Sequence, residues 1–376
     1  MKDVLKSRRV DSFASRIGPR LATGAWGTAT EDLVSVETKD YITLVQPVRT
    51  GVAPQSIPVM DLAPFLVGEP GALDAAASTL RYALEEVGFY VIVGHGVAQG
   101  VIDEAYSQIR SFFAMQTEKK MALAKNEHNI GYTPIGARYS RPSSDLNDSA
   151  KKEAAAESYF MKADLAPDHP DVLAGKKFRS PNLWPAEIDA PDFRAAMATY
   201  MRTLETLGRS LLPLYARALD LPLDYFDKAF AEPMYTLRIS RYPRQATLDG
   251  NKQGLPPHTD TSFMTLLPFN RVQGLQVRLT GGSWIDAPAV PGSFVVNSGN
   301  MLRRWSNDRC MSTPHQVVNL SPEERYALPF FFDCNRDWLM DCMPSCISPS
   351  NPPRYEPMTY ADYMSWYSTV SQRGGT

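Results

Sequence analysis

The chain has 376 residues, of which 44% are hydrophobic and 21% are charged. This composition is typical of a folded globular protein and excludes a mostly disordered or a collagen-like chain. The 39 basic and 41 acidic side chains nearly cancel, to a formal net charge of −2, so no strong overall field is available to attract nucleic acid or an anionic membrane.

The cysteine pattern and the lack of targeting segments bear on the compartment. All four cysteines, Cys310, Cys334, Cys342 and Cys346, lie in the last quarter of the chain, and four are too few for a disulfide framework, so free thiols are expected. No apolar run approaches the ~18 residues of a membrane-spanning helix, and the first residues lack the apolar segment of a secretory signal. The sequence therefore predicts a cytoplasmic protein without membrane contact.

The first half of the chain combines strand signals with helical periodicity. Residues 1–52 are only weakly periodic and are interpreted as an N-terminal extension. The elements expected next are a strand at 57–62, a helix at 73–87 that stops at Gly88, a buried strand at 88–93, a helix at 98–115 and a long helix at 191–219 kinked near Pro213. Residues 125–152 lack periodicity and are expected to form a long loop, which is often functional.

From about residue 235 the pattern changes to short alternating runs separated by Gly, Pro, Asn and Asp. The expected strands are 236–242, 262–268, 275–279, 293–297, 313–318 and 325–333. Short strands at this spacing indicate a sandwich or barrel. We predict one domain over 53–376, with a helical part at 53–234, a β core at about 235–335 and a C-terminal segment at 336–376 that holds a helix near 359–370.

Two histidines and one aspartate have the pattern of a metal site. His258 and Asp260 lie two residues apart in a strand-like run, and alternate residues of a strand project from the same face. His315, in another such run, is the best third ligand among the remaining histidines. Two histidines and one carboxylate leave three positions of an octahedral metal open, which suits a non-haem Fe(II) that binds a cosubstrate and O₂. The same ligands could hold zinc with a water.

Arg325 lies ten residues after His315, at the start of an otherwise apolar strand-like run. Burying a guanidinium is costly unless an anion meets it, and its planar fork matches a carboxylate. A dicarboxylate that binds the metal at one end and Arg325 at the other, such as 2-oxoglutarate, would meet both needs. On strand alternation Arg325, Ala327 and Phe331 share one face, and Pro329 predicts an edge or a bulge in this strand.

Several segments together resemble, in order, the isopenicillin N synthase-like family of 2-oxoglutarate/Fe(II)-dependent dioxygenases. The similar segments are Ile57–Leu62, Gly88–Val97, Asn182–Pro185, Leu237–Pro243, the His258-Thr259-Asp260 motif, His315 and Arg325. They run over roughly 57–335, which is most of the chain. The resemblance implies a mainly β fold with flanking helices, built on a double-stranded β-helix (a jelly-roll, cupin-like core).

The resemblance also implies a role for each matching residue. His258, Asp260 and His315 would bind Fe(II), and Arg325 with Tyr242 would hold the distal carboxylate of 2-oxoglutarate. The cofactors would be Fe(II), 2-oxoglutarate and O₂, with ascorbate as a supporting reductant. The reaction would be hydroxylation, desaturation or ring closure on a small molecule, in specialised metabolism or on an amino-acid derivative. Nucleic acid is not an expected partner, and no oligomeric state is indicated.

One departure from the family pattern keeps alternatives open. The family's Arg-x-Ser reads Arg325-Tyr326-Ala327 here, so one hydroxyl is missing beside the cosubstrate. A relative that does not use 2-oxoglutarate conventionally, such as a ring-forming or ethylene-forming type, is therefore the first alternative. A zinc hydrolase on a jelly roll and a non-catalytic binding protein are weaker ones.

Substrate contacts are the least determined part of the prediction. The candidates are Arg238, Phe263, Arg138, Tyr139 and Phe331. By parity Arg238 shares a strand face with Tyr242, but it could equally form a structural ion pair; Phe263 could line the site or pack in the core; and Arg138 could be a solvated loop charge. The other histidines, His95, His128 and His169, are expected to be structural or solvated.

Overall fold

Two β-sheets form the centre of the fold, and residues of both line one cavity. The computed structural model describes residues 56–139, 152–244, 254–319 and 321–373, which belong to one compact unit. The predicted N-terminal extension at 1–52 and its boundary lie outside the described residues, as does much of the predicted loop at 125–152. The part of that loop that is described includes short strands.

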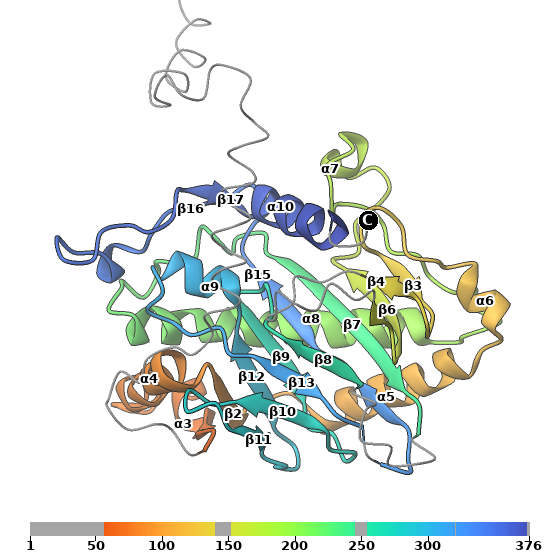
Figure 1. Cartoon of the computed structure of the whole chain (residues 1–376), viewed down its shortest axis with the longest axis horizontal. Coiled ribbons are helices and arrows are strands. Elements are labelled where there is room, and N and C mark those ends of the chain that lie inside the picture. Colours follow the sequence, from red (N-terminus) through yellow and green to blue (C-terminus); the bar gives the residue numbers. More distant parts are fainter. Residues whose placement is uncertain (1–55, 140–151, 245–253, 320, 374–376) are drawn as a thin grey trace, which may run out of the picture. The chain divides into compact units, whose positions relative to one another are not determined.

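The larger sheet has nine strands in the described part of the chain, in the order β1-β2-β12-β9-β15-β7-β6-β3, with β14 paired to β7 beside that path. Its strands are β1 (Val59–Asp61), β2 (Phe89–Val93), β3 (Gly131–Thr133), β6 (Glu157–Lys162), β7 (Met234–Tyr242), β9 (Met264–Pro268), β12 (Phe294–Ser298), β14 (Arg325–Ala327) and β15 (Phe330–Asp333). All neighbours are antiparallel except β1 and β2. Strands of the large sheet lie side by side in Figure 1.

The smaller sheet has the order β11-β10-β13-β8 and is antiparallel. Its strands are β8 (Leu255–His258), β10 (Leu275–Arg278), β11 (Trp284–Asp286) and β13 (His315–Val317). Two further pairs are small: β4 (Arg138–Tyr139) with β5 (Lys152–Glu153), and β16 (Leu339–Met340) with β17 (Met358–Thr359). Two mainly antiparallel sheets that close over a cavity confirm the predicted jelly-roll core.

Helices cover the outer face of the large sheet. The longest, α8 (Phe193–Ala218), lies behind β15 and continues through Pro213, and α4 (Ala72–Tyr82) and α5 (Gln99–Ala114) pack against α8 (Figure 1). The remaining helices are α3 (Ala63–Leu66), a π-helical turn (Ala83–Val87) that extends α4, α6 (Thr117–Met121), α7 (Pro170–Leu173), α9 (Asn300–Trp305), a 3₁₀ turn (Pro344–Cys346) and α10 (Tyr360–Arg373). The three helices expected from periodicity and the C-terminal helix predicted near 359–370 are confirmed. No helix of the described residues is both long and apolar enough to cross a membrane.

The strand predicted at 325–333 is divided in two. β14 ends at Ala327 and pairs only with β7, whereas β15 begins at Phe330 and lies between β7 and β9. The break contains Pro329, which has no N–H to donate to a ladder, although its carbonyl still accepts a hydrogen bond from Arg238 N (3.0 Å). The expected interruption is confirmed, and it leaves β14 as a separate three-residue strand.

Gly88 ends the helical segment before β2 and lies against the segment that leads into β13 and His315. It has φ +72°, and a Cβ there would lie 2.1 Å from Thr313 Oγ1, whose hydroxyl donates to Val87 O (2.7 Å). We expect Gly88→Ala to lower the free energy of unfolding by about 3 kcal/mol or more, because the cost of a positive φ and the cost of a clash with the Thr313 side chain add.

The matched control for this prediction is Gly68→Ala. Gly68 has nearly the same φ, +74°, but nothing lies within 4 Å of a Cβ added there, so only the conformational cost of about 1 kcal/mol applies. Urea denaturation of both variants measures the difference, and equal losses would contradict the proposed clash with Thr313.

Candidate metal centre

Three side chains from the small sheet and its following loop converge at one end of the cavity. His258 is the last residue of β8, His315 is the first of β13, and the two are register partners across the ladder. Asp260 Oδ1 lies 3.8 Å from His258 Nε2 and 3.6 Å from His315 Nε2. One potential ligand atom from each residue lies within 4.8 Å of the others, so one metal ion could contact all three.

Hydrogen bonds orient each of these groups for a cation. The Nδ1 atoms of His258 and His315 lie 2.9 and 3.1 Å from the backbone oxygens of Pro256 and Thr313. A proton on Nδ1 satisfies those carbonyls and leaves the Nε2 lone pair free for a metal. Because the carbonyls come from the residue two positions earlier, the local strand backbone itself fixes each tautomer.

Hydrogen bonds also orient the carboxylate of Asp260, and both of them are accepted by the same oxygen. Its Oδ2 accepts hydrogen bonds from Thr265 Oγ1 (2.7 Å) and Asn297 Nδ2 (2.8 Å), which are contributed by β9 and β12 of the large sheet. Oδ1 is thereby turned towards the two imidazoles. Supporting hydrogen bonds of this kind are typical of metal ligands. The sequence analysis missed Thr265 and Asn297, because nothing in a single sequence pairs them with Asp260.

Arg325 is the second unusual feature of the cavity. It is only 2% exposed, and its Nε and Nη1 have no hydrogen-bond partner among the described residues. Burial lowers its pKa below the usual value. Its register partner on β7 is Tyr242, with the guanidinium carbon 5.3 Å from the centre of the phenol ring. A buried cation with unused donors is costly, so a ligand carboxylate is the natural partner.

Both features lie on the wall of one cavity between the two sheets. The lining includes the three potential metal ligands, Arg325, Tyr242, Arg238, Ser240, Thr265, Asn297, Ala327 and Phe331, together with apolar side chains of both sheets such as Phe89, Leu255 and Val317. The predicted alternation is correct, since Arg325, Ala327 and Phe331 all face this cavity. A mostly apolar cavity with a few convergent polar groups is typical of a small-molecule site.

The predicted substrate residues divide three ways. Arg238 and Phe331 line the cavity. The idea that Phe263 contacts substrate is corrected: its ring is fully buried in an aromatic cluster with Tyr215, Phe226, Phe230 and Trp305, because it precedes β9 on the face turned to the helices. Arg138 and Tyr139 form β4, but their side chains are outside the described part, so their role stays a prediction.

Two of the remaining histidines, His95 and His169, have structural contacts away from the potential metal ligands. His95 lies in the turn after β2, with Nε2 2.8 Å from Gly292 O and Nδ1 accepting from Val97 N (3.1 Å). His169 caps α7 by accepting from Asp171 N. Neither belongs to the group that could hold a metal among the described residues.

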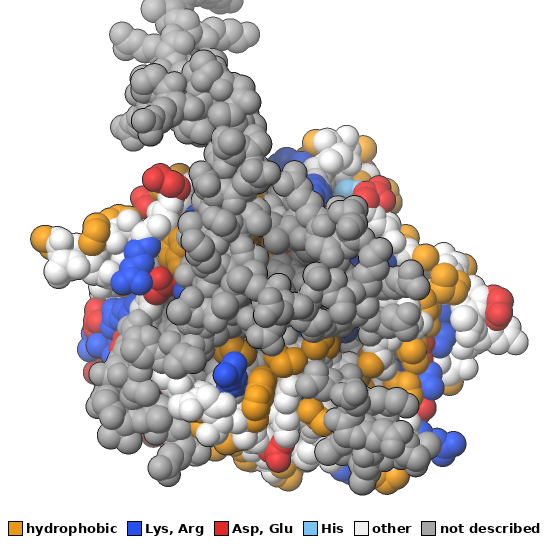
Figure 2. Space-filling model, viewed as in Figure 1, with side chains coloured by type: hydrophobic (Ala, Val, Ile, Leu, Met, Phe, Trp, Pro, Cys, Tyr) orange, Lys and Arg blue, Asp and Glu red, His pale blue; other side chains and the backbone are white. Residues whose placement is uncertain are grey.

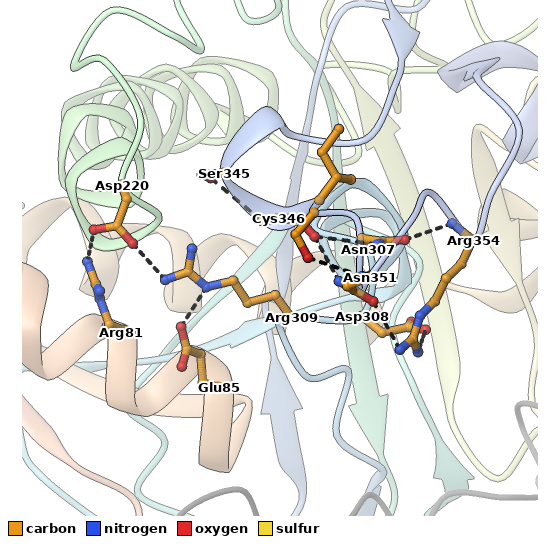
Figure 3. A pocket seen from close by; sticks show the side chains of 12 residues that line it. Arg81, Glu85, Asp220, Asn307, Asp308, Arg309, Ser345, Cys346, Asn351 and Arg354 are labelled. Atoms are coloured by element: carbon orange, nitrogen blue, oxygen red, sulfur yellow. Dashed lines mark hydrogen bonds and ion pairs between the residues drawn. The ribbon is translucent and has the colours of Figure 1, made fainter.

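A second cavity, beside the α4 segment, has a different character (Figure 3). Its cations are already paired within it: Arg309 contacts Glu85 and Asp220, Arg81 contacts Asp220, and Arg354 contacts Asp308. These ion pairs connect α4, the end of α8 and the C-terminal segment. Their charges satisfy one another, so this cavity is better explained as a structural junction than as a reaction site.

Charged side chains of both signs are visible on the face of the molecule drawn in Figure 2. In the described atoms visible in Figure 2, Lys and Arg side chains lie close to Asp and Glu side chains rather than in a broad patch of one sign. This agrees with the small net charge of the chain; that nucleic acid is not a partner stays a prediction.

Comparison with known proteins gives a consistent family. The family model of the non-haem dioxygenase in morphine synthesis N-terminal region matches residues 57–187, and that of the 2OG-Fe(II) oxygenase superfamily matches residues 233–333. The 2-oxoglutarate-Fe(II) type oxidoreductase hxnY of Emericella nidulans is 32% identical over 317 residues, covering 83% of this chain and 89% of the relative. Kihadalactone A synthase of Citrus sinensis is 31% identical, covering 82% and 91%.

A solved structure agrees. A 2OG-Fe(II) oxygenase family protein from Caulobacter crescentus superposes with a TM-score of 0.72 and 27% identity, covering 85% of this chain and 99% of that protein. The resemblance drawn from ordered motifs is thus confirmed, and the fold, the converging His-Asp-His group and the relatives lead to one assignment. The chain belongs to the 2-oxoglutarate/Fe(II)-dependent oxygenase superfamily, an enzyme family whose cofactors are Fe(II) and 2-oxoglutarate.

Proposed function

We propose that this oxygenase oxidises a small organic molecule, by hydroxylation, desaturation or ring closure, with His258, Asp260 and His315 holding Fe(II) and Arg325 with Tyr242 holding the distal carboxylate of 2-oxoglutarate. The observation that carries the proposal is the buried guanidinium of Arg325, which has unused donors and faces the same cavity as the three potential ligands. A dicarboxylate reaching from the metal to Arg325 satisfies both.

The residues fit this pair of cofactors. Two imidazole Nε2 atoms and one carboxylate oxygen suit a divalent iron and leave other coordination positions for a cosubstrate. Iron with 2-oxoglutarate supplies the oxidising power when bound, and the protein supplies binding, orientation and exclusion of water. Around the cavity, apolar side chains such as Leu255, Leu275 and Val317 exclude water from the charged groups.

The same observation ranks the alternatives. A zinc hydrolase would use the three ligands but would leave Arg325 buried without an anion, at a cost of several kcal/mol. A relative that dispenses with 2-oxoglutarate meets the same objection. Ala327 takes the place of the family serine and lies opposite Ser240 in the β14–β7 ladder. Both residues line the cavity, so the Ser240 hydroxyl lies directly across the ladder from the position of the missing one.

Arg238 and Phe331 are our candidates for substrate contacts. Arg238 donates from Nε and Nη2 to Ser158 Oγ (3.1 and 3.0 Å) and lies 5.4 Å from the centre of the Phe160 ring. Contacts on two sides fix the guanidinium in the cavity wall, where it can meet a carboxylate or carbonyl oxygen of a substrate. Phe331 offers an apolar surface in the same cavity.

Relatives support a small-molecule substrate and a place in specialised or amino-acid metabolism. Those with informative names include kihadalactone A synthase and a homoarginine-6-hydroxylase of Arabidopsis thaliana, which is 29% identical over 78% of this chain. The individual substrate differs among them, so we propose the class and not the compound. The cytoplasmic location expected from the sequence stays a prediction.

An anaerobic titration tests the proposed cofactor use. Fe(II) and 2-oxoglutarate added to the protein without O₂ should give a visible charge-transfer band, and a panel of small carboxylic acids and amino-acid derivatives should include compounds that shift it. Turnover should then release succinate with product. Product without succinate, or activity with zinc in the absence of O₂, would contradict the proposal.

Arg238→Gln separates the substrate role from the cosubstrate role. If Arg238 binds substrate, the variant should lose at least about tenfold in affinity for the compound of that panel that shifts the band most, since a charge-assisted contact is lost. Affinity for 2-oxoglutarate, measured without substrate, should stay within about twofold. A parallel loss of both affinities would show that Arg238 only supports the β6–β7 pair.

A further inference from the structure

The strand that carries Arg325 is held from its outer face by a row of charged side chains. β6, β7 and β14 are adjacent, and Glu157, Arg241 and Tyr326 are register partners across them. Because successive strand residues alternate between faces, this row lies opposite the face on which Tyr242 and Arg325 line the cavity. The row therefore touches no ligand and acts only through the strands.

The anchor of the row is the buried carboxylate of Glu157. It accepts from Lys120 Nζ (2.7 Å) and Tyr132 OH (2.5 Å), and its other oxygen accepts from Arg241. The Lys120 and Glu157 side chains are only 5% and 3% exposed. Three donors around one buried carboxylate make a rigid, strongly coupled group, in contrast to an isolated surface pair.

From this anchor the row reaches the residue before Arg325. Arg241 Nε donates to Glu324 Oε1 (3.0 Å), and Tyr326 OH donates to Glu324 Oε2 (2.6 Å). The Tyr326 hydroxyl, and then Arg241, hold the pKa of Glu324 below its usual value, so the carboxylate stays ionised at neutral pH. Glu324 and Tyr326 flank Arg325 in sequence, and both are tied to β7.

β14 needs such support. It has three residues, pairs with β7 alone and ends before the break at Pro329. Its first residue is the fully buried Arg325. Removing this guanidinium from water costs free energy, and that cost is offset when an anion binds. Pairing over three residues stabilises a strand only slightly, so β14 needs further contacts to keep Arg325 buried.

We propose that Glu324, fixed by Arg241 and Tyr326, is a positioning residue that holds Arg325 at the depth required for the distal carboxylate of 2-oxoglutarate. The inference rests on the proposed role of Arg325. The row depends on a charged pair, Arg241 and Glu324, which connects β7 to the residue before β14, and both strands contribute residues to the cavity wall.

The neighbouring Glu323 provides a matched control. Glu323→Gln removes the same charge one residue away, from an ion pair with Arg271 in which the side chains are 53% and 77% exposed. We would measure calorimetric affinities of Mn²⁺-loaded protein for 2-oxoglutarate and for 2-oxobutyrate, which binds a metal in the same way but has no distal carboxylate. Glu324→Gln should lower the affinity for 2-oxoglutarate roughly tenfold and leave the affinity for 2-oxobutyrate unchanged. Glu323→Gln should change neither affinity.

Two further variants make each outcome decisive. Tyr326→Phe is a milder change that keeps the strand. It should lower the affinity for 2-oxoglutarate by a smaller factor and leave the affinity for 2-oxobutyrate unchanged. In an Arg325→Met background, Glu324→Gln should have no additional effect. Equal results for Glu324→Gln and Glu323→Gln, or equal losses for both oxoacids, would overturn the positioning role while Arg325 keeps its own. If Arg325→Met alone left the affinity for 2-oxoglutarate intact, the proposed function itself would fail.

Discussion

Arg325→Met is expected to make the ligand-free protein more stable and at the same time to weaken its binding of 2-oxoglutarate strongly. The guanidinium is buried, and two of its nitrogens have no partner among the described residues. Methionine has a similar length and no charge, so it removes a desolvation cost that only a bound anion offsets. We expect a gain of about 1–4 kcal/mol in the free energy of unfolding, by analogy with other buried charges replaced by apolar residues.

The opposite signs of the two effects are what distinguish a binding residue from a structural one. If the guanidinium stabilised the fold through contacts within the protein, its loss in Arg325→Met would lower the free energy of unfolding. Wild-type protein should gain thermal stability when 2-oxoglutarate and Mn²⁺ are added, by RT ln(1 + [L]/Kd), whereas the variant should gain much less from 2-oxoglutarate beyond what the metal alone gives.

Arg325→Lys is the control for this experiment. It keeps the buried charge but loses the planar fork, so it should show the low ligand-free stability of the wild type together with weakened 2-oxoglutarate binding. A methionine variant that unfolds more easily than the wild type, or that responds to 2-oxoglutarate as strongly as the wild type, would refute the assignment of Arg325. Denaturant unfolding and differential scanning calorimetry measure both quantities.

The sequence was a good guide where one residue's environment follows from its neighbours along the chain. Periodicity located α4, α5 and α8, because an amphipathic helix shows its buried face within a few turns. Strand alternation placed Arg325, Ala327 and Phe331 on one face, and Pro329 predicted the break between β14 and β15. These inferences need only local stereochemistry.

Features that depend on distant segments could not be obtained in this way. The donors to Asp260 lie on β9 and β12, and Glu157 and Arg241 meet only because β6 and β7 are neighbours in register. Phe263 follows Asp260 closely in sequence, yet its ring packs with α8 residues such as Tyr215, because the chain turns before β9. A single sequence does not encode such pairings in any local pattern.

Asp260→Asn is expected to abolish metal binding while preserving the fold, for a reason visible in the hydrogen bonds. Oδ2 of Asp260 accepts from Thr265 Oγ1 and Asn297 Nδ2. An asparagine must therefore place its single oxygen at that position, to satisfy the two donors. Its NH₂ group then occupies the position of Oδ1, facing the Nε2 atoms of His258 and His315, which are 3.8 and 3.6 Å away.

In that orientation the amide N–H groups point at the imidazole lone pairs and exclude a cation from between them, because an NH₂ group has no lone pair to offer. Affinity for Mn²⁺ or Fe²⁺ should fall by at least about 100-fold, more than the loss from removing a supporting hydrogen bond. Thr265→Val supplies that comparison: it keeps the ligand and removes one donor, and should cost roughly tenfold. Metal titration by calorimetry, with circular dichroism to verify the fold, measures both variants. If Asp260→Asn bound metal as well as Thr265→Val does, Oδ1 could not be the ligand atom, and the convergence of His258, Asp260 and His315 would need another explanation.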